Sequence, residues 1–93
     1  MKNKKISIIR KKLDKLDISM LSLIKRRNLL VNKILEQKKY KNQIIDRQRI
    51  KVILKKIKIE SRKKNIDYKI TETIWKSMIR AFINYEFKNF KKK

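Results

Sequence analysis

The chain of 93 residues is long enough for one domain, and its formal net charge of +22 directs attention to anionic partners such as nucleic acid or a membrane surface. It contains no Gly, Pro, Cys or His. The absence of Gly and Pro favours long helices with few turns. The absence of Cys and His excludes disulfides, thiolate nucleophiles, the usual zinc ligands and His-based triads.

The positive charge also has a simpler explanation. Most of the basic residues are Lys, Ile is frequent and Ala occurs once, a composition typical of a genome rich in A and T. Such a bias supplies solvent-exposed Lys without any anionic partner. No segment has the apolar length of a secretion signal or the roughly 20 apolar residues of a membrane span. We therefore expect a soluble cytoplasmic protein with no membrane partner.

Apolar residues predict a first helix over residues 7–39. From Ile9 to Ile34 they recur in steps of three and four, as on one face of a helix. Arg27 interrupts this series and Lys38 continues it, about 20° apart around the helix axis. Such a helix spans roughly 50 Å, too much for a chain of this size to bury alone, so we expect a second chain beside it.

Two further helices are predicted over residues 46–64 and 70–90, with Asp46 and Asp67 as their N-caps. We expect the connection at residues 40–45 to be mobile. In the last helix, Glu86 shares the apolar face with Trp75, Met78, Ile79 and Phe82. The opposite face carries Lys76, Arg80, Asn84 and Lys88. Because no strand pattern occurs, the prediction is one all-α domain over residues 1–93.

Three ionisable residues are thus predicted to face inward: Arg27, Lys38 and Glu86. A buried charge is costly unless it is paired or binds an ion. A buried Arg–Glu salt bridge is one explanation, and a Lys near a helix end can also extend its ammonium group to solvent. The alternative is a polar pocket for an anion inside a helical bundle, where two cations and a carboxyl group act electrostatically rather than covalently.

Three segments carry a resemblance to a known family: IIRKKLDKLDISMLSLIKRRNLLVNKILEQKK, IIDRQR and IWKSMIRAFINYE. The most specific feature is a spacing, because Arg10 is followed 17 positions later by Arg27, the second residue of an Arg-Arg pair, and 11 positions after that by Lys38. In these features nearly the whole chain resembles the all-α (AroQ) class of chorismate mutases.

The resemblance implies a three-helix chorismate mutase type II fold in which two chains intertwine into a homodimer with two sites. It also implies the rearrangement of chorismate to prephenate, a step of aromatic amino acid biosynthesis in the shikimate pathway, with no cofactor and no metal. The catalytic residues of this isomerase would be Lys38, Glu86 and Arg27. The residues that bind the dicarboxylate substrate would be Arg10, Arg27, Lys38, Asp46, Arg49, Ile50, Phe82 and Glu86.

The helix geometry agrees with a homodimer. Arg10 and Arg27 are about 25 Å apart along one helix, so they cannot both hold one small dicarboxylate. An antiparallel partner chain removes this difficulty, because it can supply Arg10 across the interface. Converging Arg and Lys side chains also suit a substrate with two carboxylates.

Two positions depart from the common family pattern. Where many members carry Gln, this chain has Glu86, whose carboxylate would repel negative charge in the transition state but whose protonated form could donate a hydrogen bond. We therefore expect activity that falls as pH rises and recovers in Glu86→Gln. Where mutases often carry Glu, this chain has Ile50. An apolar residue there also occurs in isochorismate pyruvate lyases, a branch of the same fold that forms salicylate and pyruvate.

A basic helical protein that binds nucleic acid is the remaining alternative. Tyr85, Phe87 and Phe90 lie near a basic tail, as in surfaces where aromatic rings stack on bases. No recognised nucleic-acid motif occurs, and exposed Lys follows from the composition alone. A nucleic acid is therefore the less favoured partner.

Overall fold

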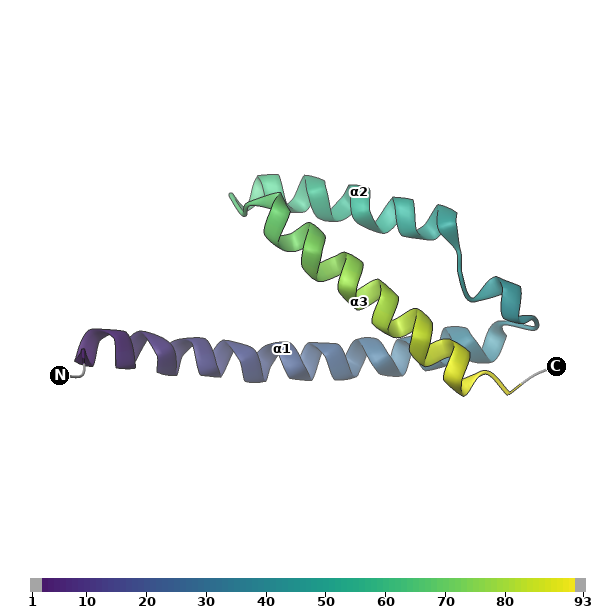
Figure 1. Ribbon diagram of the computed structural model, residues 1–93, viewed down its shortest axis with the longest axis horizontal. Coiled ribbons are helices and arrows are strands. Elements are labelled where there is room, and N and C mark those ends of the chain that lie inside the picture. The colour runs from purple at the N-terminus through teal and green to yellow at the C-terminus, as the bar shows by residue number, and fades with distance from the viewer. Residues whose placement is uncertain (1–2, 92–93) are drawn as a thin grey trace. The chain divides into compact units, whose positions relative to one another are not determined.

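The computed structural model describes residues 3–91, which form three α-helices and no strand (Figure 1). Helix α1 spans Lys4–Gln37, α2 spans Arg47–Lys63 and α3 spans Tyr68–Asn89. A short 3-10 helix, η1, spans Lys41–Gln43 between α1 and α2. The predicted all-α class with one long N-terminal helix is confirmed.

Helix α1 begins before the predicted start at residue 7 and ends at Gln37, so Lys38 lies one residue beyond it. The backbone N–H of Lys38 donates to the carbonyl of Leu35 at 3.1 Å, three residues back, which is the tighter pattern common at helix ends. The helix therefore ends two residues before the predicted end at residue 39, and Lys38 lies at its C-terminal boundary. Its position is set by the turn that follows α1.

The chain divides into two units, and the first, Met1–Asn32, is helical from Lys4 onward. Large apolar side chains in this unit are exposed, among them Ile9 (57%), Leu16 (60%) and Leu21 (61%). A lone helix is marginal in water, because helical stability in proteins comes mostly from packing an apolar face. The second chain expected beside α1 stays a prediction.

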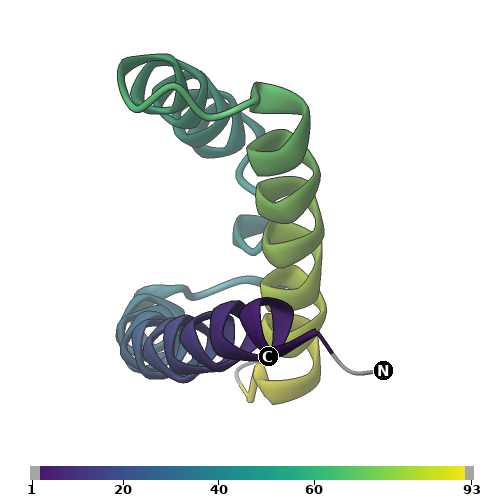
Figure 2. The same cartoon turned by 90° about the vertical axis from the view of Figure 1, so that its left-hand side faces the viewer.

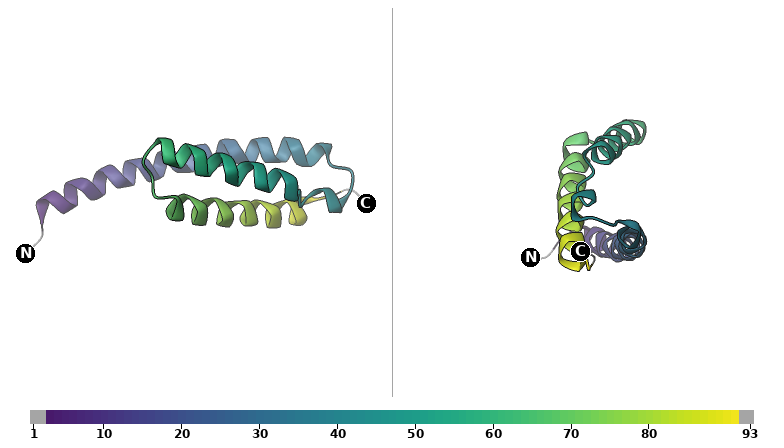
Figure 3. Two further views of the ribbon diagram at one scale, coloured as in Figure 1. Left: turned by 90° about the horizontal axis from the view of Figure 1, so that it is seen from above. Right: turned by 90° about the vertical axis from the view of Figure 1, so that its right-hand side faces the viewer.

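The second unit, Lys33–Lys93, contains the end of α1, η1 and a hairpin in which α2 and α3 pack together (Figures 2 and 3). Asn65 turns the chain between them with a left-handed φ of 56°, which Asn tolerates better than most residues. Near this turn the hydroxyls of Ser61 and Thr71 share a buried hydrogen bond of 2.8 Å. The pair satisfies two buried polar groups that would otherwise destabilise the hairpin.

Both predicted N-caps are present in the structure. Asp46 Oδ1 accepts the backbone N–H of Arg49 at 2.9 Å, and Asp67 Oδ1 accepts that of Lys69 at 2.9 Å. Each carboxylate satisfies an N–H group that has no partner inside the helix. These caps fix where α2 and α3 begin.

Candidate functional site

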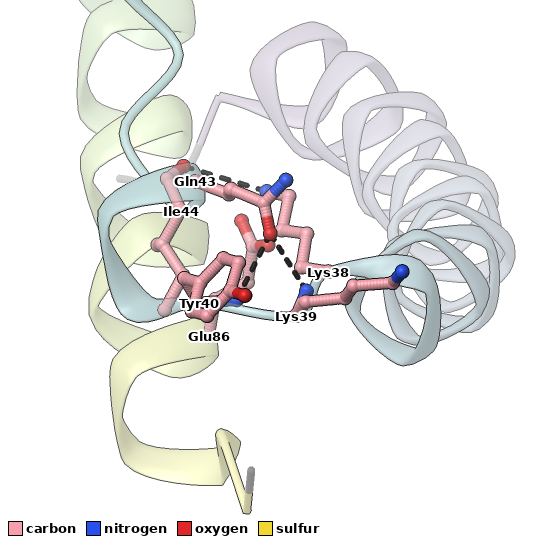
Figure 4. Close-up of polar contacts among 6 residues, drawn as sticks. All are labelled: Lys38, Lys39, Tyr40, Gln43, Ile44 and Glu86. Carbon is pink, nitrogen blue, oxygen red and sulfur yellow. Dashed lines mark hydrogen bonds and ion pairs between the residues drawn. The ribbon is translucent and has the colours of Figure 1, made fainter. Parts of the chain in front are cut away.

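Lys38 and Glu86 meet in the second unit, 48 residues apart in sequence (Figure 4). The Lys38 ammonium donates to Glu86 Oε1 at 2.8 Å, and the two side chains are 16% and 10% exposed. At this burial a charge-assisted hydrogen bond is strong, whereas either charge alone would be costly. The predicted inward-facing cation and carboxyl group are therefore each other's partners.

Glu86 is placed by the amphipathic pattern of α3. Residues on its inward face are half-buried, whereas the residues predicted to point away are exposed, namely Lys76, Arg80, Asn84 and Lys88. Phe82 lies one helical turn before Glu86 and packs edge-on against Tyr85, with ring centroids 6.4 Å apart. Glu86 therefore follows from the periodicity of the helix, and its burial on that face is confirmed.

Lys38 is placed by the turn at residues 38–44. Its ammonium also donates to the carbonyl of Ile44 at 3.5 Å, and Ile44 is only 3% exposed. Gln43 Oε1 accepts the backbone N–H of Lys39 at 2.6 Å and that of Tyr40 at 2.9 Å. The connection at residues 40–45 thus contains a hydrogen-bonded turn beside the Lys38 side chain, and its mobility stays a prediction.

Gln43 is a residue that the sequence did not single out. It is exposed and lies in a polar stretch, where neither apolar periodicity nor charge pattern marks it. One local sequence signal for Gln43 exists. A Gln at the third residue of a short helix can accept a hydrogen bond from the backbone at the start of that helix.

Among the other predicted residues of this unit, Asp46 is the N-cap of α2, Arg49 and Ile50 lie on α2, and Phe82 lies on α3. Asp46 acts on the backbone N–H of Arg49 and not on its guanidinium group. The Arg49 side chain is exposed. Ile50 and Phe82 are half-buried.

Arg10 and Arg27 both lie on α1 in the first unit. Arg10 is exposed and Arg27 is half-buried. Since α1 is continuous between them, their backbones are about 25 Å apart at 1.5 Å per residue. One chain therefore cannot bring these two residues to one small molecule.

Within the described residues, no group of three or more His, Cys, Asp or Glu is arranged to hold a metal ion. No helix between residues 3 and 91 has both the length and the apolar character needed to cross a membrane. Within the Lys38–Glu86 pair the ammonium group is the hydrogen-bond donor and the carboxylate is the acceptor.

One comparison with known proteins gives a match. A family model described as chorismate mutase type II matches residues 9–87. No curated protein and no solved structure matches the chain significantly. The matched segment starts before Arg10 and ends after Glu86, so it includes every candidate residue named above.

Proposed function

Because the chain belongs to the chorismate mutase type II family, we propose that it converts chorismate to prephenate as a cytoplasmic step of aromatic amino acid biosynthesis. In this rearrangement a C–O bond to the enolpyruvyl arm breaks as a C–C bond forms, and no atom is gained or lost. The observation that carries the proposal is the largely buried Lys38–Glu86 pair, joined at 2.8 Å.

Lys38 stabilises the charge that develops as the C–O bond breaks. An ammonium group has three donors, and the structure engages two acceptors, Glu86 Oε1 at 2.8 Å and the Ile44 carbonyl at 3.5 Å. The third donor serves the ether oxygen of the substrate, whose negative charge grows in the transition state. Because Lys38 is already held, little reorganisation is needed when the substrate binds.

The remaining candidate residues hold the substrate. Arg27 and the partner's Arg10 bind its two carboxylates and keep the enolpyruvyl arm above the ring, which is a proximity effect. Arg49 contacts the ring side, and Asp46 orders the start of α2 through the backbone of Arg49. Ile50 and Phe82, both half-buried, supply apolar walls.

A homodimer completes this site. Two observations support it: most large apolar side chains along α1 are 42–64% exposed in the single chain, and α1 separates Arg10 from Arg27 by about 25 Å. Burial of such a face against a second copy provides the packing that a long helix needs. The active species is then a dimer with two equivalent sites.

Glu86 is expected to limit the rate of the wild type. Its Oε1 accepts from Lys38, so a carboxylate places negative charge beside the reacting oxygen, whereas the amide of Gln can donate a hydrogen bond there. We expect Glu86→Gln to raise kcat for chorismate. Steady-state rates of both proteins test this, and an unchanged or lower kcat in Glu86→Gln contradicts it.

The second candidate function is elimination of pyruvate from isochorismate, which Ile50 favours. This residue lies in the first turn of α2 and is half-buried, where an acidic side chain would contact a ring hydroxyl in many mutases. The test is to incubate the protein with chorismate and, in parallel, with isochorismate, and to identify the products by chromatography. Formation of prephenate from chorismate supports the mutase activity. Formation of salicylate and pyruvate from isochorismate, with chorismate unchanged, supports the lyase activity instead.

Ile50→Glu separates the two activities further. A carboxylate at this position adds an acceptor for the ring hydroxyl, which is worth about 1.5–3 kcal/mol for a charged hydrogen bond. We expect the ratio of chorismate turnover to isochorismate turnover to rise about tenfold or more. Ile50→Gln, which is similar in size but uncharged, is the control, and an unchanged ratio in Ile50→Glu means that Ile50 does not face the ring.

A further inference from the structure

We propose that Gln43 is a positioning residue for Lys38. Its side chain holds the backbone of the turn from which the Lys38 ammonium reaches Glu86. The proposal deepens the proposed function and rests on it where catalysis is concerned. Gln43 itself does not touch the substrate.

Lys38 cannot rely on α1 for its position. Because α1 ends at Gln37, the N–H of Lys38 is the last one tied back toward the helix, through Leu35 at 3.1 Å. The next two N–H groups, those of Lys39 and Tyr40, both donate to Gln43 Oε1, at 2.6 and 2.9 Å. The side-chain oxygen of Gln43 thus accepts the two backbone N–H groups that follow the last N–H bonded to α1.

The same turn closes from its other end. Gln43 donates its own backbone N–H to the Tyr40 carbonyl at 3.1 Å, and Ile44 donates to Lys41 at 3.1 Å. Ile44 is buried, and its carbonyl accepts from the Lys38 ammonium at 3.5 Å. Gln43 therefore links two parts of the turn (Figure 4). Its side chain holds the N–H groups of Lys39 and Tyr40, and the next residue, Ile44, supplies the carbonyl that accepts from the Lys38 ammonium.

Loss of the Gln43 carbonyl oxygen frees two backbone N–H groups next to Lys38. The turn then samples other conformations, and the Lys38 ammonium leaves its position beside Glu86 for part of the time. Stabilisation of a transition state depends on donors that are already in place, so displacement lowers kcat more than it weakens ground-state binding.

The test compares three variants of the full-length protein. Gln43→Ala removes the acceptor, Gln43→Glu keeps an oxygen that accepts both N–H groups, and Asn42→Ala is a matched control. Asn42 is the neighbouring exposed residue of η1, and its side chain makes no hydrogen bond within the described residues. Amide exchange at Lys39 and Tyr40, the NMR signal of the Lys38 side chain, and kcat and KM for chorismate are measured for each.

We expect Gln43→Ala to accelerate amide exchange at both positions, to shift the Lys38 signal and to lower kcat about tenfold with a smaller change in KM, the effect of about one net hydrogen bond. We expect Gln43→Glu to keep the amide exchange, the Lys38 signal and kcat near their wild-type values. Asn42→Ala should change none of these three quantities. The proposal is overturned if the Lys38 signal in Gln43→Ala equals that of the wild type, or if kcat persists despite faster exchange. A wild type that leaves chorismate untouched refutes the proposed function instead, and the Lys38 signal then decides the positioning role by itself.

Discussion

Replacing Lys38 by Met is expected to lower kcat/KM for chorismate by a factor of about a hundred to a thousand, which is typical for loss of one preorganised donor to a developing anion. Met keeps the apolar stem of Lys and removes only the cation. Glu86 and the Ile44 carbonyl lose their shared donor at the same time. Steady-state rates on chorismate measure the effect.

Lys39→Met is the matched control, because Lys39 is the next residue, has the same chemistry and is exposed. It should retain wild-type rates. Removing one member of a buried ion pair costs about 3–5 kcal/mol of stability in other proteins, so the unfolding curve of Lys38→Met is measured together with its rate. Lys38→Met combined with Glu86→Gln leaves no unpaired charge, so it should be folded and still inactive. Full activity in that folded double variant contradicts the role of Lys38.

Arg10→Ala and Arg27→Ala are each expected to lower kcat/KM about a hundredfold, because each removes a charged hydrogen-bonding partner of a substrate carboxylate. The stronger prediction concerns their mixture. If each site combines Arg27 of one chain with the partner's Arg10, a heterodimer of the two variants contains one complete site and one doubly defective site. Random exchange of subunits then restores about a quarter of the wild-type activity.

The experiment mixes the two inactive dimers, unfolds and refolds them together, and assays chorismate turnover. Refolding each variant alone provides the background, and native mass measurement confirms that dimers form. Arg26→Ala and Lys11→Ala are matched controls, because both residues are exposed neighbours of the two Arg positions. If the mixture stays at the background level although heterodimers are present, Arg10 is not supplied across the interface.

Some of this site could be predicted from the sequence because it follows helical periodicity. Glu86 lies on the inward face of α3, and its burial there needs only the 3.6-residue repeat. Asp46 and Asp67 are caps because a short acidic side chain before an amphipathic run satisfies free N–H groups. The spacing of Arg10, Arg27 and Lys38 stood out as a resemblance to a known family and not through periodicity, and a site that these residues share stays a prediction.

The turn after α1 could not be predicted in this way. Lys38 departs from the helix by one residue, and its position depends on Gln43 accepting two backbone N–H groups. A bond between a side chain and a nearby backbone has no periodicity, and competing local bonds of this kind are numerous. The buried Ser61–Thr71 hydrogen bond was missed for a related reason, because it joins two hydroxyls whose contact depends on how α2 and α3 pack.

We propose above that a site containing the Lys38–Glu86 pair rearranges chorismate. The most direct measurement is to incubate wild-type protein and Lys38→Met, purified in the same way, with chorismate and to quantify prephenate over time. We expect prephenate from the wild type and only the spontaneous background from Lys38→Met. Equal rates from the two proteins, or a wild type no faster than buffer, contradict it.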